Sequence, residues 1–558
     1  MIMPRLKLNN TTTCLLIFIL FFILSFWFTK APITHLDSMA PQGGDPFLVT
    51  WIWSWEMHQL PINPLTVFDA NIFAPFKNTL AFTEHMFGSL LLAWPLFLIF
   101  KNIVLVYNLI CHLTFAIGGL GMYLLAYYLT KNRAASFIAA FIYAFAPYKI
   151  NHLEHINLSG LWLPYFLLYT QKMFARFSWP NALLFLGFSL LVFLNAMQYF
   201  LFLPFVFIFL AIAHWQSDSW ALLKRNWFKI TVIFLIFSAV VVIFTKPYFE
   251  IRQEFGLERA INNIEGLSPD LIDYFISPFF YRIFYPAFFP EWAIGPGIFV
   301  WLLLITSLVF LFRRHAIDRR LVAYSTFGLL ALLCSLGYYL QFTRAETSGL
   351  FGPWAIFYHL LPGFGSIRAV GRYSIFFLLA ASIIIALGLK EFFLIKQKNN
   401  LPKIFITSVA LFILLFVEFS FTTPKSYKSL LPAPAVCSWL KDQPPSQTYL
   451  ELPSGVSLLE NNWDAIYEYW SISHFQKMIN GYSGYSPRVH QELNKRLLDF
   501  DLDISDLQAA KDYGATRLIF HFGFYPPAFK EKIIHLLPSG DFANLIYQSE
   551  NDYVYQIK

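Results

Sequence analysis

Charged residues are scarce in this sequence. They make up 13% of its 558 residues, which is about half the share found in soluble globular domains. A chain with so little charge is not solvated by water over its whole surface. Hydrophobic residues make up 57% instead and gather in long runs, so we expect the lipid bilayer to surround most of the chain.

Cysteine is also rare, with four residues in the whole chain. Cys14, Cys111 and Cys334 lie inside apolar runs, and Cys437 stands alone in the C-terminal part. Their spacing excludes a disulfide framework and a Cys-x-x-Cys metal site. The net charge of +7 comes from lysines and arginines in short segments between apolar runs. That pattern sets membrane orientation, so nucleic acid is excluded as a partner.

About eleven apolar runs are predicted to cross the membrane as helices. A helix needs about 20 mostly apolar residues to cross the hydrocarbon, and some of these runs are shorter. Arg5 and Lys7 precede the first run, and no small-residue cleavage site follows it, so we expect an uncleaved span. The runs cover residues 15–28, 104–129, 134–148, 158–169, 181–194, 200–213, 230–244, 297–312, 321–340, 374–389 and 404–419.

Residues 90–100 form one further apolar run, and this run decides the topology. It is short, contains Pro95 and ends before Lys101, so we predict a helix at the membrane interface rather than a span. With a cytoplasmic N-terminus, every short basic loop then lies on the cytoplasmic side, as the positive-inside rule requires. These loops carry Lys131, Arg133, Lys172, Arg176, Lys224, Arg225, Lys229, Arg313, Arg314, Arg319, Arg320, Lys390, Lys396, Lys398 and Lys403.

The predicted topology places a large first loop (residues 30–103), a loop with Arg344 and a C-terminal tail on the outer side. The tail has the composition of a soluble domain, with strands predicted at 449–452 and 516–522 and helices at 505–512 and 529–537. We therefore predict an α-helical polytopic membrane protein. Its transmembrane domain covers residues 1–421, and a small extracytoplasmic α/β domain covers residues 422–558.

Asp45 opens a Trp-rich segment of the first outer loop. Gly43 and Gly44 precede it and permit a tight turn that aims one carboxylate. Trp51 and Trp55 follow on a helix predicted to lie at the membrane interface. A carboxylate in that place could take a proton from an incoming hydroxyl. The local pattern alone favours a simpler role for Asp45, as the N-cap of the helix.

Two groups of acidic residues and histidines also lie in outer segments. Glu84 and His85 precede the interfacial run and could hold a metal or orient a substrate, or could simply begin a helix. His152, Glu154 and His155 lie at the outer end of a span, where residues three apart share a helix face. They lack the His-Glu-x-x-His spacing of a zinc site, so we expect them to line an outer cavity without a metal.

Arg368 and Arg372 follow a glycine-containing turn at the outer start of a span. Because they are four residues apart, we expect them to share one helix face, where two guanidinium groups suit a phosphate or pyrophosphate. The alternative is anchoring in lipid headgroups. In the tail, the Gly- and Tyr-rich loop 480–487 could cap a sugar-binding cleft by ring stacking, or it could be a structural turn.

These features resemble the GT-C superfamily of integral membrane glycosyltransferases, and one bacterial branch of it in particular. The shared plan is an Asp soon after the first span, here Asp45, followed by an interfacial run, many spans and an outer tail. The closer motifs are Gly44-Asp45-Pro46 with the tryptophans that follow, Phe73-Ala74-Pro75, and segments 147–155 and 367–373. By architecture the resemblance covers most of the chain.

The resemblance implies an inverting transfer of a hexose or pentose from a polyprenyl-phosphate-linked donor to a glycan, lipid or protein acceptor. The reaction would take place at the outer face of the inner or plasma membrane. Asp45 would be the general base, or another acidic residue of the first loop if Asp45 is not. The first loop lacks a second acidic motif of the oligosaccharyltransferase type, so a divalent metal stays open. Arg368 or Arg372 would bind the phosphate leaving group, and the cavity would be lined by Glu84, His85, His152, Glu154 and His155.

Two other classes of protein share a polytopic plan. A transporter or flippase is expected to carry charged residues midway along broken helices, whereas the predicted spans hold almost none. A polysaccharide polymerase or ligase of the cell envelope has a similar plan. The placement of the ionisable residues in outer loops favours the glycosyltransferase over the transporter.

Overall fold

The computed structural model describes residues 9–216, 219–256, 258–276, 278, 294–343, 349–397, 401–455, 462–498, 502–537 and 542–558. Arg5, Lys7, Arg344 and Lys398, which the topology prediction used, lie outside these ranges. The chain forms two compact units. Unit 1 comprises Met1–Thr34, Asn108–Ile243 and Leu257–Ser426, and unit 2 comprises His35–Tyr107, Phe244–Gly256 and Tyr427–Lys558.

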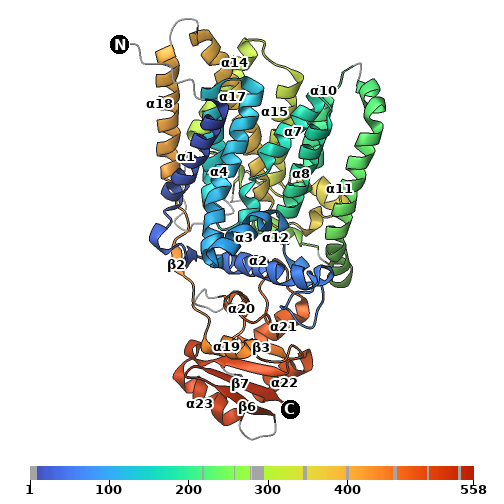
Figure 1. Cartoon of the computed structure of the whole chain (residues 1–558), viewed down its shortest axis with the longest axis vertical. Coiled ribbons are helices and arrows are strands. Elements are labelled where there is room, and N and C mark those ends of the chain that lie inside the picture. The colour runs from blue at the N-terminus through green and yellow to red at the C-terminus, as the bar shows by residue number, and fades with distance from the viewer. Residues whose placement is uncertain are drawn as a thin grey trace. The chain divides into compact units, whose positions relative to one another are not determined.

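Unit 1 is a bundle of helices that run side by side (Figure 1). Each apolar run predicted to span the membrane overlaps a helix, although the helix over the run 158–169 begins only at Leu163. These helices are α1 (Asn10–Thr29), α4 (Ile103–Thr130), α5 (Arg133–Phe145), α7 (Leu163–Ala175), α8 (Trp179–Asn195), α10 (Leu203–His214), α11 (Ser219–Phe255), α14 (Ile298–Arg313), α15 (Arg319–Ser335), α17 (Ser374–Gln397) and α18 (Leu401–Ser420). Shorter helices between them are α6 (Pro147–Asn151), α9 (Met197–Phe200), α12 (Ile261–Gly266) and α16 (Pro353–Leu360).

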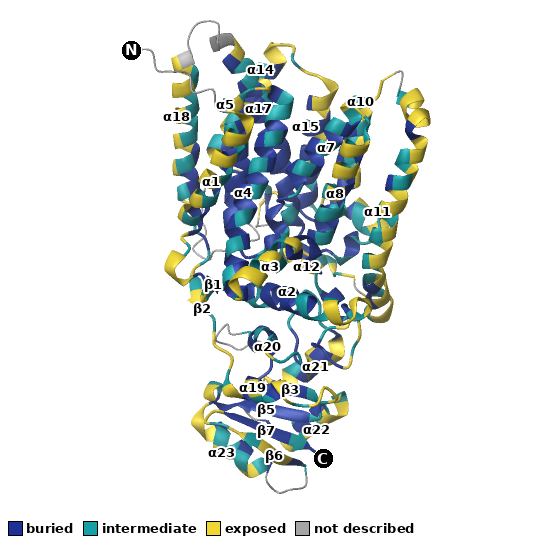
Figure 2. Cartoon of the chain, viewed as in Figure 1, coloured by how far each residue is buried: buried dark blue, intermediate teal, exposed yellow. Residues whose placement is uncertain are grey.

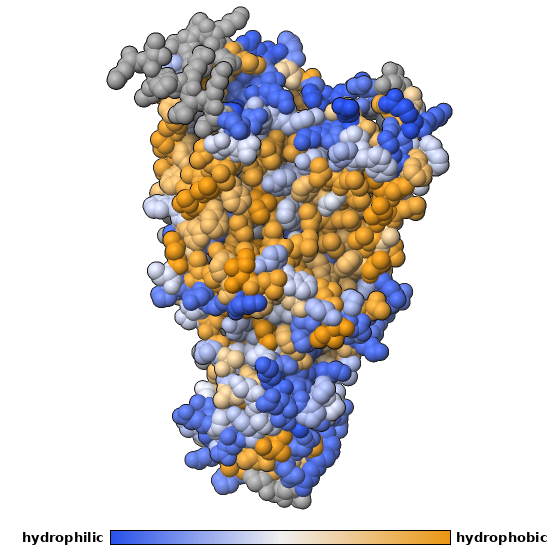
Figure 3. Space-filling view, viewed as in Figure 1, coloured by the Kyte–Doolittle hydropathy of each residue, from blue (hydrophilic) through white to orange (hydrophobic). Residues whose placement is uncertain are grey.

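Six helical segments among the described residues are long and apolar enough to cross a membrane. They are Asn10–Thr29, Ile103–Thr130, Met197–His214, Ser219–Phe255, Val370–Leu394 and Pro402–Ser420. Apolar side chains gather over the helices of unit 1 on the face seen in Figure 3. An exposed apolar surface of this kind is stable where lipid is the solvent. The prediction of a multi-span membrane protein is therefore supported, and the number and direction of spans stay predictions.

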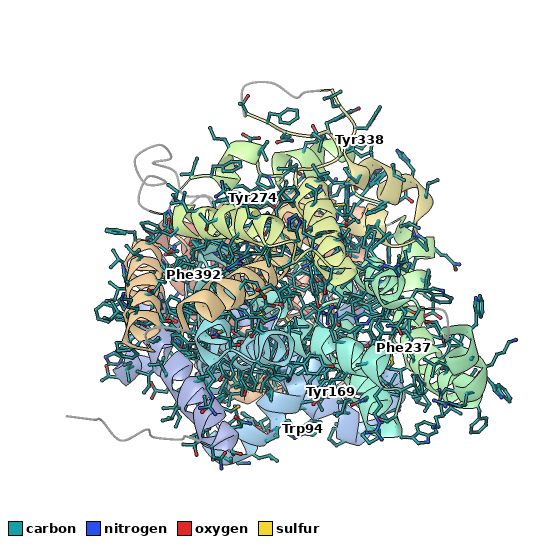
Figure 4. All side chains as sticks on the ribbon, turned by 90° about the horizontal axis from the view of Figure 1, so that it is seen from above. Trp94, Tyr169, Phe237, Tyr274, Tyr338 and Phe392 are labelled. Atoms are coloured by element: carbon teal, nitrogen blue, oxygen red, sulfur yellow. The ribbon has the colours of Figure 1, made fainter. Side chains whose placement is uncertain are left out.

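Helix α17 forms the centre of unit 1. It packs against α5, α14 and α15, and its residues from Ile375 to Ala386 are almost all buried (Figure 2). A helix that is apolar on every side is stable only when neighbours or lipid surround it. The peripheral α11 instead packs through a small cluster of Ile233 with Ala182 and Leu186 of α8. Figure 4, a view along the helices, labels Phe237, which joins that cluster.

Unit 2 combines the first outer loop with the tail. Strand β1 (Met39–Pro41) in the loop pairs antiparallel with β2 (Tyr427–Ser429), which follows the last span. The loop also contains α2 (Asp45–Ile62) and α3 (Phe87–Phe100). The run 90–100 is thus a helix of 14 residues, too short to cross the hydrocarbon comfortably. Its interfacial position stays a prediction, as does the domain boundary at 421/422.

The tail folds around a five-stranded sheet in the order β4-β3-β5-β7-β6. Strands β3 (Thr448–Leu452), β4 (Lys477–Met478) and β5 (Arg517–His521) are parallel to one another. Strand β7 (Asp552–Ile557) runs antiparallel to both of its neighbours, β5 and β6 (Ala543–Gln548). The helices are α19 (Ala435–Lys441), α20 (Trp463–Ser471), α21 (Arg488–Leu497), α22 (Ile504–Tyr513) and α23 (Pro527–Leu536). The strands and helices predicted for the tail are confirmed.

A buried ionic cluster links three strands of this sheet. His521 of β5 lies between two carboxylates, with Nδ1 2.8 Å from Asp552 Oδ1 and Nε2 2.9 Å from Glu451 Oε2. The Tyr467 ring stacks on the imidazole at 5.0 Å between centroids. Burial lowers the pKa of His521, but its hydrogen bonds to the two carboxylates outweigh burial and raise that pKa to about 9. The imidazole is therefore charged at neutral pH.

Candidate active site

Asp45 is the first residue of α2, and Gly44 occupies the N-cap position. The interpretation of Asp45 as the N-cap is therefore wrong. Pro46 follows within the first turn, where its missing N–H costs nothing because that group has no helical partner. The carboxylate lies at the positive end of the helix dipole, which stabilises a negative charge. Asp45 is half-buried, so its carboxylate is partly screened from solvent and can still be contacted by a bound molecule.

The tryptophans after Asp45 pack inside unit 2. Trp51 and Trp53 are fully buried, whereas the sequence had suggested an amphipathic face at the membrane interface. Trp51 Nε1 donates to Asn71 Oδ1 at 3.0 Å. Asn71 in turn donates to Ser471 Oγ of α20 at 3.1 Å. The reason for the difference is that α2 packs against two other helices of unit 2, α20 of the tail and α3 (Phe87–Phe100), where Trp53 Nε1 donates to Ser89 Oγ at 3.2 Å.

The loop 480–487 of the tail packs against the first outer loop. The Phe73 N–H donates to the Asn480 carbonyl at 3.2 Å. The Tyr485 ring lies 5.5 Å from Phe82 between centroids, and Tyr482 Oη lies 3.5 Å from Asp45 Oδ1. The structure thus brings together two motifs that the sequence singled out separately.

His85 is buried in a cage of aromatic rings. Its ring centroid lies 4.9 Å from that of Phe87 and 5.4 Å from that of Phe244. Burial lowers the pKa of His85 to about 3, so the imidazole is neutral. Glu84 beside it is half-buried. These surroundings position His85 firmly and give it no charge with which to bind an anion.

In unit 1, Glu154 is held by two basic groups. Its Oε1 lies 2.6 Å from Lys425 Nζ and 3.3 Å from His155 Nδ1. Burial raises the pKa of Glu154, but His155 and Lys425 outweigh burial and lower that pKa to about 2. His152 stacks on Tyr148 with 4.4 Å between ring centroids. The three predicted cavity residues are therefore neighbours, with Glu154 fully ionised at neutral pH.

Arg368 and Arg372 do not share a helix face. Residues 367–369 are non-helical, and only Arg372 lies in a short 3-10 helix, Val370–Tyr373. The prediction failed because it assumed that the helix of the following span begins before Arg368. Arg368 is exposed and Arg372 is half-buried. The Arg372 carbonyl accepts a hydrogen bond from Tyr148 Oη at 3.3 Å, which ties this turn to the segment that precedes His152.

Several buried carboxyl groups of unit 2 were not singled out from the sequence, among them Glu56 and Glu468. Glu56 on α2 is completely buried, and its oxygens have no hydrogen-bond partner among the described residues. Burial raises the pKa of Glu56 well above the usual value of a carboxyl group. Glu468 on α20 is equally buried, and burial raises its pKa too. A signal for Glu56 was available, because it lies about three helical turns after Asp45 on the same face of α2.

A divalent metal needs several His, Cys, Asp or Glu side chains grouped around one point. Among the residues that the structure describes, no three such side chains are grouped so that they could hold a metal ion. Glu154 is instead paired with Lys425. The described residues therefore do not fit a divalent metal.

The chain is similar to known proteins in structure and not in sequence. No protein-family model and no curated protein sequence matches the chain. Among solved structures, the arabinofuranosyltransferase AftD from Mycobacteria matches over 99% of this chain and 42% of its own, with a TM-score of 0.54 at 13% identity. The chain thus spans about two fifths of the length of AftD.

Two further structures match less closely. The oligosaccharyltransferase AglB from Archaeoglobus fulgidus, solved with an inhibitory peptide and a dolichol-phosphate, matches over 98% of this chain and 74% of its own (TM-score 0.48, 11% identity). ArnT from Cupriavidus metallidurans, bound to undecaprenyl phosphate, matches over 98% of both chains (TM-score 0.44, 10% identity). The match to AftD shows that this chain shares the fold of part of that arabinofuranosyltransferase, which agrees with the fold that the resemblance to the GT-C superfamily predicts.

Proposed function

We propose that this chain is a membrane glycosyltransferase that moves a sugar from a polyprenyl-phosphate-linked donor to an acceptor hydroxyl. The observation that carries the proposal is the half-buried Asp45 carboxylate in the first turn of α2, against a loop of the tail. The GT-C fold supports it, and AftD by its name transfers a pentose. The sugar moved here is a pentose or a hexose.

The proposed reaction is a single displacement. Asp45 takes the proton of the acceptor hydroxyl as its oxygen attacks the anomeric carbon of the donor sugar. The new carbon–oxygen bond forms while the bond from that carbon to the phosphate oxygen breaks. The bonding electrons leave with the polyprenyl phosphate, and the anomeric configuration inverts. General-base catalysis of this kind contributes about 10²- to 10⁴-fold to a rate.

The experiment that tests this function uses the full chain in lipid vesicles. Synthetic polyprenyl-phosphate-linked pentoses and hexoses are supplied as donors, together with lipid and glycan extracts of the host envelope as acceptors. We expect the sugar of one donor to appear in the acceptor fraction by mass spectrometry. Release of no sugar from any donor would refute the proposal. Movement of an intact donor between leaflets would instead indicate a flippase.

Arg368 is proposed to bind the phosphate of the donor, because an exposed guanidinium at a turn suits bidentate contact with phosphate oxygens. Arg368→Ala should raise KM for the donor about tenfold, which is the effect of losing one charged hydrogen bond. Initial rates against donor concentration in the vesicle assay measure this. Arg176→Ala, which removes another exposed arginine, is the matched control. An unchanged KM in Arg368→Ala would contradict the assignment.

The tail is proposed to lie on the extracytoplasmic side of the cell membrane, because the basic loops between spans would then all be cytoplasmic. Alkaline phosphatase fused after Lys558 should be active in cells, since that enzyme matures only outside the cytoplasm. The same reporter fused after Lys131, in a loop predicted to be cytoplasmic, should be inactive. The reverse pattern would overturn the topology.

A further inference from the structure

The loop after β4 reaches the first turn of α2. Tyr482 Oη lies 3.5 Å from Asp45 Oδ1, at the outer limit of a hydrogen bond. The phenol ring rests directly on Gly44, where an added Cβ would lie 2.7 Å from Tyr482 Cζ and 2.9 Å from its hydroxyl oxygen. A side chain at position 44 would therefore force the Tyr482 ring to shift from its place beside the carboxylate.

The same loop is fixed on its other side. Gly481 lies against the Phe73 ring, so closely that a Cβ there would lie 2.5 Å from ring carbons. The Tyr482 N–H donates to Glu468 Oε1 of α20. Glu468 is fully buried, and its second oxygen has no hydrogen-bond partner among the described residues. This buried acceptor holds the backbone of Tyr482 in place, because breaking the hydrogen bond would leave the buried carboxyl oxygen of Glu468 without a partner, at a cost in free energy.

The group that this loop presents to Asp45 is the phenol hydroxyl of Tyr482. A hydroxyl that donates to a carboxylate favours its ionised form and restricts its rotation. An ionised, oriented carboxylate is what a general base requires.

We propose that Tyr482, supplied by the C-terminal tail, is a positioning residue for Asp45 in sugar transfer. The inference rests on the proposed function and deepens it, because it makes the tail a part of the transfer site. Tyr482 touches neither sugar nor phosphate in this assignment and acts through Asp45. The tail, the first outer loop and α2 then work as one body, in agreement with their grouping in unit 2.

The test compares Tyr482→Phe with the unchanged chain in the vesicle assay. The phenylalanine ring keeps the packing on Gly44 and removes only the hydroxyl. We expect kcat to fall about tenfold, the effect of one lost hydrogen bond to a charged group, while KM for the donor stays the same. A purely structural role would not separate kcat from KM. Tyr469→Phe is the matched control, because its ring contacts Phe47 of α2 away from the carboxylate.

A second variant keeps the proposal testable by another route. Gly44→Ala pushes the Tyr482 ring away from Asp45 and should lower kcat about tenfold, as loss of the same hydrogen bond does in Tyr482→Phe. Wild-type kcat in Tyr482→Phe, together with an inactive Asp45→Asn, would overturn the positioning role alone. Full activity in Asp45→Asn would overturn the proposed base, and the positioning role with it.

Discussion

Replacing Asp45 with asparagine should lower kcat for sugar transfer by about 10²- to 10⁴-fold, the usual contribution of a general base. Asparagine has nearly the size of aspartate and keeps an oxygen in the same place, so the turn at Gly44 and the start of α2 should persist. What it loses is the ability to accept a proton from the acceptor hydroxyl. The vesicle assay with polyprenyl-phosphate-linked donors measures kcat, and KM for the donor should stay nearly constant.

Asp37→Asn is the matched control for this prediction. Asp37 lies in the same outer loop and is exposed, and its replacement should leave transfer unchanged. Thermal unfolding of both variants in detergent shows whether either substitution damages the fold. Full activity in Asp45→Asn would refute the assignment of the base. If Asp37→Asn lost activity and Asp45→Asn kept it, Asp37 would be the general base.

The helices could be predicted from the sequence because their signal is local. A run of apolar residues long enough to approach the thickness of the bilayer indicates a helix whatever the rest of the chain does. The alternation and turn residues around strands β3 and β5 are local in the same way. The short helix over the run 90–100 could be predicted for the same reason, because the length of the run and Pro95 are properties of the run itself.

The neighbours of Asp45 could not be predicted, because the contacts around it join distant parts of the chain. Tyr482 is separated from Asp45 by 437 residues, and no periodicity links the two. The same holds for Glu154 and Lys425 in unit 1. The prediction that Arg368 and Arg372 share a helix face was wrong, because residues four apart share a face only inside a helix. The chain is not helical at Arg368.

Replacing His521 with alanine should lower the free energy of unfolding of the tail by about 3 to 5 kcal/mol, since this is the cost of breaking a buried ion pair from one side. The substitution leaves both Glu451 and Asp552 without the cation that they share. It also removes the ring on which Tyr467 stacks. Hydrogen–deuterium exchange of the full chain in detergent should show faster exchange in β3, β5 and β7. His535→Ala, an exposed histidine of the same domain, should change exchange little.

The same cluster should make the stability of the tail depend on pH, in a direction that follows from the charge on His521. The folded pKa of about 9 lies above the value near 6.5 that histidine has in an unfolded chain, so between these values the folded state binds more protons. Stability is then fully present below about pH 6.5 and is lost as the pH rises towards 9, by roughly 3 kcal/mol in all.

Burial also raises the pKa of Glu451, so its contribution to stability is lost as the pH rises from the unfolded pKa of about 4.3 through its folded pKa. Exchange rates in β3, β5 and β7, corrected for the intrinsic pH dependence of amide exchange, should therefore increase between pH 6.5 and 9 in the unchanged chain. His521→Ala should remove the part of this change that the imidazole causes. Constant corrected rates in the unchanged chain would show that His521 does not hold an extra proton in the folded state.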